Sequence, residues 1–198
     1  MYWILFVASV VLAIVLNLRW PGLPEPDPSA LLRDNWFLWG FNYFGLLLMP
    51  MAALLIDDAR RKNMRWPFYV VPFFVVGILA LSVYMARRPA RDLVQRDTPR
   101  ILEVHWVWWL LLTALVAATL FFIPRGSLAQ LVDTMSKNLG LAFMWLDIVL
   151  NHVVALPLAQ ADMQRRGVTQ QTAWLIAILL TGPIALCTYM ASRPPIRS

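Results

Sequence analysis

The sequence predicts an all-α integral membrane protein made of two diverged copies of one three-helix unit. The first observation is composition: 60% of the 198 residues are hydrophobic and 14% are charged, whereas about a quarter of the residues in a soluble domain are charged. The second is a set of six apolar segments, each near or above the roughly 17 residues that a membrane-spanning helix needs. The third is an internal repeat.

The repeat matches residues 77–89, GILALSVYMARRP, to residues 182–194, GPIALCTYMASRP, at an offset of 105 residues. Apolar sequence produces chance matches of Leu and Ala, but not of Gly, Tyr-Met and Arg-x-Pro in one register. We therefore interpret the chain as a duplication. Extended without gaps, the same offset pairs Asp57 with Asp162, Arg60 with Arg165, Arg61 with Arg166, and Asn42 with Asp147.

Charged or proline-rich stretches separate the six predicted helices, because such stretches cannot lie in hydrocarbon. The first helix ends at Arg19, the third at Arg87-Arg88-Pro89, and the fourth before Pro124. The predicted helices cover residues 2–18, 36–56, 66–86, 104–123, 139–160 and 173–191. The corresponding units are residues 1–89 and 104–194, with a connecting loop at 90–103 and a tail at 195–198.

Three helices in each unit, an odd number, predict that the second unit has inverted topology. Such units are related by a pseudo-twofold axis in the membrane plane. The Lys and Arg residues of the loops would then divide almost evenly between the two membrane faces, so the positive-inside rule gives no orientation. The N-terminal apolar segment has no basic flank and no small-x-small motif. It is expected to remain as a helix and not to act as a signal peptide.

Asp147 is the most informative polar residue, because a carboxylate in the middle of a membrane helix costs about 2.5–3.5 kcal/mol and needs a partner. Asn151, four residues later, shares its helix face. An inverted pair of units would bring Asn42 close to Asp147 at the midplane, where such proteins bind ligands. Asp147 is then a candidate proton donor. The alternative is that the Asp–Asn cluster only joins helices.

His152 is a second candidate catalytic residue, although a lone histidine in an apolar helix is more often a packing residue. No other His, Cys or Glu stands at ligand spacing, so neither a metal site nor a cofactor is expected. Aromatic faces stabilise positive charge. A pocket for an apolar ligand is therefore expected to include Asn42 and Asn151 together with the aromatic residues Trp39, Tyr43, Phe44 and Trp145.

Residues 141–194 carry Leu141-Ala142, Trp145, a polar residue seven positions later, Asp162, and Gly182-Pro183 before the closing arginine. This pattern resembles a family of small plastid and cyanobacterial membrane proteins required for formation of the carotenoid neoxanthin. The family has Asp at the polar position, where this chain has His152. The resemblance implies a connection with carotenoids or other isoprenoid lipids.

Three function classes follow. The first is a protein that binds or converts a carotenoid or other isoprenoid lipid inside the bilayer. The second is an accessory subunit of a larger membrane complex, such as a photosynthetic one, which the ten Trp residues favour. The third is a small transporter, for which a homodimer would be needed. Membrane lipids are the expected partners, nucleic acid is not, and the expected location is the bacterial inner membrane. The net charge of +6 suits anionic headgroups.

Overall fold

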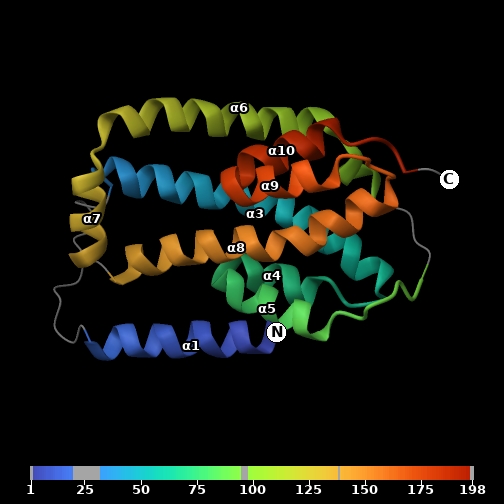
Figure 1. Ribbon diagram of the computed structural model, residues 1–198, viewed down its shortest axis with the longest axis horizontal. Coiled ribbons are helices and arrows are strands. Elements are labelled where there is room, and N and C mark those ends of the chain that lie inside the picture. Colours follow the sequence, from blue (N-terminus) through green and yellow to red (C-terminus); the bar gives the residue numbers. More distant parts are fainter. Residues whose placement is uncertain (1, 20–31, 95–97, 138, 197–198) are drawn as a thin grey trace.

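A computed structural model describes residues 2–19, 32–94, 98–137 and 139–196, and this part of the chain contains helices, turns and loops but no strand (Figure 1). The α-helices are α1 (Tyr2–Arg19), α3 (Asn35–Arg61), α4 (Pro67–Val76), α5 (Ile78–Arg87), α6 (His105–Phe122), α7 (Leu128–Lys137), α8 (Leu139–Arg165), α9 (Gln171–Thr181) and α10 (Pro183–Ser192). Two short 3₁₀ turns, η1 (Arg100–Glu103) and η2 (Ile123–Arg125), flank α6.

Three helical segments in the described part are long and apolar enough to cross a membrane: α3, α6 continued by η2, and the stretch of α8 from Leu141. The prediction of an all-helical chain is confirmed for the described residues, and these three segments have the length and composition of membrane-spanning helices. At about 1.5 Å per residue, the 27 residues of α3 and of α8 extend about 40 Å. Helices α3 and α8 lie side by side in the centre of the bundle, with α1 and α6 on its outer sides (Figure 1).

The predicted helices at 66–86 and 173–191 are each interrupted, which corrects the prediction of six continuous spans. Gly77 separates α4 from α5 and Gly182 separates α9 from α10, both with φ of 51°. This left-handed backbone is accessible to glycine but strained for residues with a Cβ atom. A single helix cannot continue through such a position, so the chain reverses its direction there.

Each interrupted segment folds into a helical hairpin. Tyr69 near the start of α4 contacts Tyr84 near the end of α5, with ring centroids 5.2 Å apart. Trp174 and Tyr189 make the equivalent contact in the α9–α10 hairpin, at 5.6 Å. The start and the end of each hairpin therefore lie together, and each hairpin returns to the end of the bundle from which it came (Figure 1).

The prediction of inverted units is consequently wrong. Because a hairpin returns to its starting side, each unit crosses the bundle only twice, and the second unit begins on the same side as the first. Helices α3 and α8 run in the same direction, and so do α1 and α6 (Figure 1). The two units are parallel, which is the arrangement related by an axis along the membrane normal.

The charged motifs at the ends of α3 and α8 match each other at a different sequence offset from the hairpins. Lys62 N–H donates to Asp58 O at the end of α3, as Arg166 N–H donates to Asp162 O at the end of α8. Asn63 and Gly167 follow with φ of 54° and 66°. The offset there is 104 residues, so the predicted pairing of Asp57 with Asp162 is wrong, and Asp58 is the counterpart of Asp162. Carried back along α3 and α8, this register pairs Tyr43, not Asn42, with Asp147.

The parallel arrangement also changes the distribution of basic residues. The base of each hairpin is the end at which its first helix begins and its second helix ends. In the described part, the basic residues at the opposite end of the bundle are only Arg19, Arg33, Arg125 and Lys137. The end that holds the hairpin bases carries Arg60, Arg61, Lys62, Arg65, Arg87, Arg88, Arg91, Arg100, Arg165, Arg166 and Arg193. The even division expected from inverted units disappears.

Candidate functional site

Buried ion pairs fasten each hairpin base to its own long helix. Asp162 accepts hydrogen bonds from Tyr189 Oη at 2.6 Å, Arg166 Nε at 2.9 Å and Arg193 Nη1 at 3.1 Å. In the first unit, Asp58 accepts from Tyr84 and from Arg88, whose Nε and Nη2 lie 2.6 and 2.8 Å from its oxygens. The repeated tyrosine and the repeated Arg-x-Pro therefore complete these clusters.

Further ion pairs at the same end involve the loop after the first hairpin and the turn before α6. Asp92 binds Arg61 and Lys62 at 2.8 Å each, and Glu103 binds Arg166 at 2.5 Å. Burial opposes the charged form of both carboxylates. Hydrogen bonds from Lys62 and Arg61, together with the positive charge of both residues, outweigh burial and lower the pKa of Asp92 below its usual range. A hydrogen bond from Arg166 and the charges of Arg193 and Arg166 do the same for the pKa of Glu103.

Asp147 lies at the tip of the first hairpin, where its Oδ1 accepts the backbone N–H of Ile78 at 2.8 Å and the Asn151 amide at 3.1 Å. Ile78 is the first residue of α5, and the first N–H groups of a helix have no partner inside the helix. In a low-dielectric interior such a group needs an acceptor. The carboxylate also favours the positive end of the α5 dipole. Asp147 therefore stabilises the hairpin turn.

In the second hairpin, the first residue of the second helix needs no hydrogen-bond acceptor. Its second helix starts with Pro183, which has no N–H and favours the first helical position. The residue at its tip is Tyr43, whose hydroxyl donates to Thr181 O at 3.0 Å, the carbonyl of the last residue of α9. Asp147 and Tyr43 thus occupy equivalent positions on α8 and α3, and each contacts the hairpin of the other unit.

Asn42 does not join Asp147, so the predicted pair at the midplane is not formed. Its side chain is exposed, and its amide donates to Leu38 O of its own helix at 2.7 Å. The reason is the one-residue difference in register, which turns Asn42 away from the position that Tyr43 occupies. Asn151 is fully buried beside Asp147, as its spacing predicted, and also donates to Asp147 O.

Aromatic residues gather around a pocket of about 300 Å³ between α3, α8 and α9. Trp39 and Trp145 stack with centroids 5.4 Å apart, and Trp39 contacts Tyr43 at 4.9 Å. His152 Nε2 lies 3.3 Å from the Tyr43 hydroxyl. Four of the residues predicted from sequence therefore line one pocket, whereas Phe44 packs against the core and does not line it. Asp147 does not line this pocket either.

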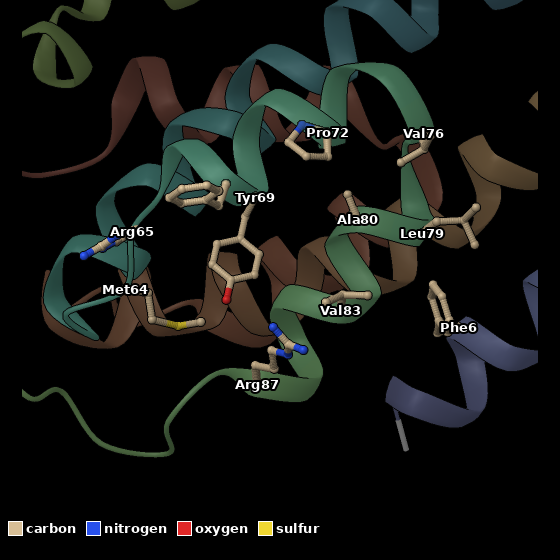
Figure 2. Close-up of a pocket in the computed structure, with 11 residues that line it drawn as sticks. Phe6, Met64, Arg65, Tyr69, Pro72, Val76, Leu79, Ala80, Val83 and Arg87 are labelled. Atoms are coloured by element: carbon tan, nitrogen blue, oxygen red, sulfur yellow. The ribbon is translucent and has the colours of Figure 1, made fainter.

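A larger groove, of about 710 Å³, lies between α1 and the first hairpin (Figure 2). Its walls are apolar, and Phe6 contributes from α1 while Pro72 and Val76 contribute from α4. Arg65 and Arg87 are also part of its lining, one just before the hairpin and the other at its end. Sequence reasoning missed this groove, because it requires the hairpin. A glycine in the middle of both repeated segments was the available signal.

Comparison of the chain with models of protein families, with curated proteins and with solved structures found no match.

Proposed function

We propose that this protein binds an isoprenoid-type lipid, such as a carotenoid, inside the membrane, with one end of the ligand in the aromatic pocket of Trp39, Tyr43, Trp145 and His152. The observation that supports the proposal is the stacked Trp39–Trp145 pair beside an open pocket. Flat, polarisable side chains suit a ring or a conjugated chain, and a pocket of this kind commonly combines apolar walls with a few polar groups.

The pocket of about 300 Å³ is sized for the end of such a ligand and not for its whole length. The rest of the ligand would lie along apolar residues that border the pocket and face outward, namely Val149, Val153 and Leu180, which are 56%, 48% and 74% exposed. Tyr43 and His152 are the polar side chains of the pocket. The Tyr43 hydroxyl already donates to Thr181 O, so its oxygen can accept a hydrogen bond from a hydroxyl group at the ligand's end.

The proposal is one of binding, and it assigns no proton transfer to Asp147. That carboxylate already accepts hydrogen bonds from Ile78 N–H and Asn151 and lies outside the pocket lining. A role as the acid of an isoprenoid rearrangement would require it to exchange these bonds for a ligand contact. Its position at the hairpin tip favours the alternative that the Asp–Asn cluster supports the fold.

The test uses β-carotene added to the purified protein in detergent, with circular dichroism recorded in the visible band of the pigment. A carotenoid held in one orientation by the pocket is expected to give an induced signal. The Trp145→Leu variant should lose most of that signal, since stacking contributes about 0.5–1.5 kcal/mol beyond the buried area. Trp109→Leu is the matched control, because Trp109 is 49% exposed on α6 and outside the pocket.

Absence of an induced signal in the wild-type protein, or an equal loss in both variants, would contradict the proposal. Purification tests the accessory-subunit alternative at the same time. Co-elution with larger partners on a sizing column, without bound pigment, would favour that alternative.

A further inference from the structure

We infer that the groove between α1 and the first hairpin is a site for an anionic phospholipid of the surrounding bilayer, with the phosphate at Arg65 and Arg87 and an acyl chain along the hairpin. This inference goes beyond the isoprenoid pocket and rests on different residues. The first observation that supports it is the shape of the groove, which follows the hairpin from the Arg65–Arg87 end to Val76 near the tip (Figure 2).

The length of the hairpin suits one leaflet. Helices α4 and α5 have ten residues each, which corresponds to about 15 Å. This is half of a hydrocarbon core of about 30 Å. A groove of that length ends near the middle of the bilayer. Its base lies at the basic end of the bundle, where a headgroup would be found.

The charge at the base is not compensated by the protein. Arg65 and Arg87 are exposed and form no ion pair among the described residues. Arg88, the next residue, shows the contrast, because its guanidinium is bound to Asp58 at 2.6 Å. Two guanidinium groups without carboxylate partners beside an apolar groove complement a phosphate joined to an apolar chain.

The second unit supplies an internal comparison. At the positions that match Arg65 and Arg87 it has Gln170 and Ser192, both uncharged and exposed. The arginines are therefore not needed to form a hairpin of this type. The residue that matches Trp3 of α1 is Trp108 of α6, which is 5% exposed, whereas Trp3 is 48% exposed. The tryptophan of the flanking helix is therefore buried in the second unit, whereas in the first unit it is half exposed and the hairpin borders a groove beside α1.

The experiment measures phospholipid retained by the full-length protein. The protein is reconstituted in vesicles of phosphatidylcholine with phosphatidylglycerol, extracted in mild detergent, and its bound lipid is identified by mass spectrometry. The wild type should retain phosphatidylglycerol above its share in the vesicle. The Arg65→Gln/Arg87→Ser variant, which copies the second unit, should retain it about thirtyfold more weakly, since each arginine near an anionic surface contributes about a fivefold factor.

Two further variants separate the groove from simple surface attraction. Val76→Trp fills the groove near its tip at a residue that is already 45% exposed, and keeps both arginines. It should also reduce retention, and Val83→Phe replaces it if the first variant does not fold. The matched charge control is Arg33→Gln/Arg125→Ser, which removes two exposed arginines at the opposite end of the bundle and should retain lipid as the wild type does.

Three outcomes would overturn the inference. Equal retention in the wild type and in Arg65→Gln/Arg87→Ser would show that the arginines do not bind the headgroup. Normal retention in the groove-filling variants would show attraction to the surface only. Displacement of the lipid by inorganic phosphate alone would identify a free-anion site. None of these results bears on the Trp39–Trp145 pocket, so the two proposals fail or stand separately.

Discussion

The two hairpins share one backbone but differ in their surroundings. Gly77 and Gly182 have the same φ of 51° and similar ψ values of −122° and −113°, and each hairpin ends in a tyrosine and an arginine bound to an aspartate of its own unit. Helix α5 packs along α1 and α10 packs along α6. The first hairpin nevertheless borders a groove beside α1, whereas the Ala191 carbonyl of α10 accepts a hydrogen bond from His105 Nδ1 at 2.9 Å.

This comparison separates residues that the hairpin needs from residues that one copy adds. The glycine, the tyrosine and the paired arginine occur in both copies because each fulfils a requirement of a helix break inside apolar surroundings. Arg65 and Arg87 occur only in the copy with the open groove. A similar difference appears at the tips of the hairpins. The tip of the first hairpin has Ile78 bound to Asp147, whereas the tip of the second has Pro183 at the position of Ile78 and Tyr43 at the position of Asp147.

The largest expected effect is the accessibility of the hairpin ends. Cysteines introduced at Ala90 and Ser192, both exposed, should be labelled from the same side of the membrane, because both hairpins return to one end. A cysteine at the exposed Ala129 of α7 should be labelled only from the other side. Membrane-impermeant thiol labelling in oriented vesicles measures this. Labelling of Ala90 and Ser192 positions from opposite sides would restore the inverted arrangement.

The next effect concerns the glycines at the tips. A Cβ atom at Gly77 would overlap Asp147 Oδ2, and one at Gly182 would overlap the His152 ring. Backbone strain, overpacking and the displaced hydrogen bond together suggest a loss of about 3–9 kcal/mol for Gly77→Ala. Thermal unfolding in detergent measures it. Gly45→Ala is the control, since nothing lies within 4 Å there, and it should change stability by about 1 kcal/mol or less.

Replacement of the paired arginine should be more damaging in the second hairpin. The Arg193 side chain is 1% exposed and also donates to Leu102 O at 2.6 Å, whereas the Arg88 side chain is 18% exposed. Breaking the more buried pair in Arg193→Gln should cost about 3 kcal/mol. Arg88→Gln should cost about 1.5–2 kcal/mol, as expected for hydrogen bonds to a charged group. Chemical denaturation of both variants in the same detergent compares them, and the reverse order would contradict this account of the clusters.

A double-mutant cycle at residues 78 and 147 tests whether Asp147 stabilises the first tip through the Ile78 N–H. Asp147→Leu should cost about 1–3 kcal/mol, because it leaves the Ile78 N–H unpaired. In an Ile78→Pro background, which copies the second hairpin, there is no N–H to satisfy, so the same replacement should cost less. Asp147→Asn should be milder, since an amide oxygen still accepts. An equal cost of Asp147→Leu in both backgrounds would show that Asp147 acts elsewhere.

The smallest effect is the pH dependence of the two loop carboxylates. The folded-state pKa of Glu103 is lowered relative to the unfolded value of about 4.3. Its contribution to the free energy of unfolding is therefore complete above that unfolded value and is lost as the pH falls through the folded-state pKa. Glu103→Gln should therefore flatten the acid limb of a plot of Tm against pH by about 2–4 °C. Asp92→Asn should do so less, because that side chain is 44% exposed. An acid limb unchanged by Glu103→Gln would contradict the assignment.

Several features of the site were accessible from residue spacing. The i to i+4 relation placed Asn151 beside Asp147, and the aromatic residues Trp39, Tyr43 and Trp145 were expected in one pocket. The partner of Asp147 was not accessible in the same way. It is a backbone N–H of Ile78, and backbone groups become free only where a helix ends. A continuous span through residues 66–86 offers no such group, so the sequence favoured Asn42 as the partner.

The sequence by itself determined the apolar helical segments, the duplication and the charged motifs, because composition and repeated residues are properties of the chain that folding does not change. Only the tertiary structure decided whether the repeated Gly bends a helix back on itself. Glycine permits the left-handed backbone at Gly77 and Gly182 but does not require it. The reversal depends on partners distant in sequence, Asp147 for one tip and Tyr43 for the other. Since each reversal changes the side on which the next helix begins, these two local contacts decide that the units are parallel and that the basic residues gather at one end.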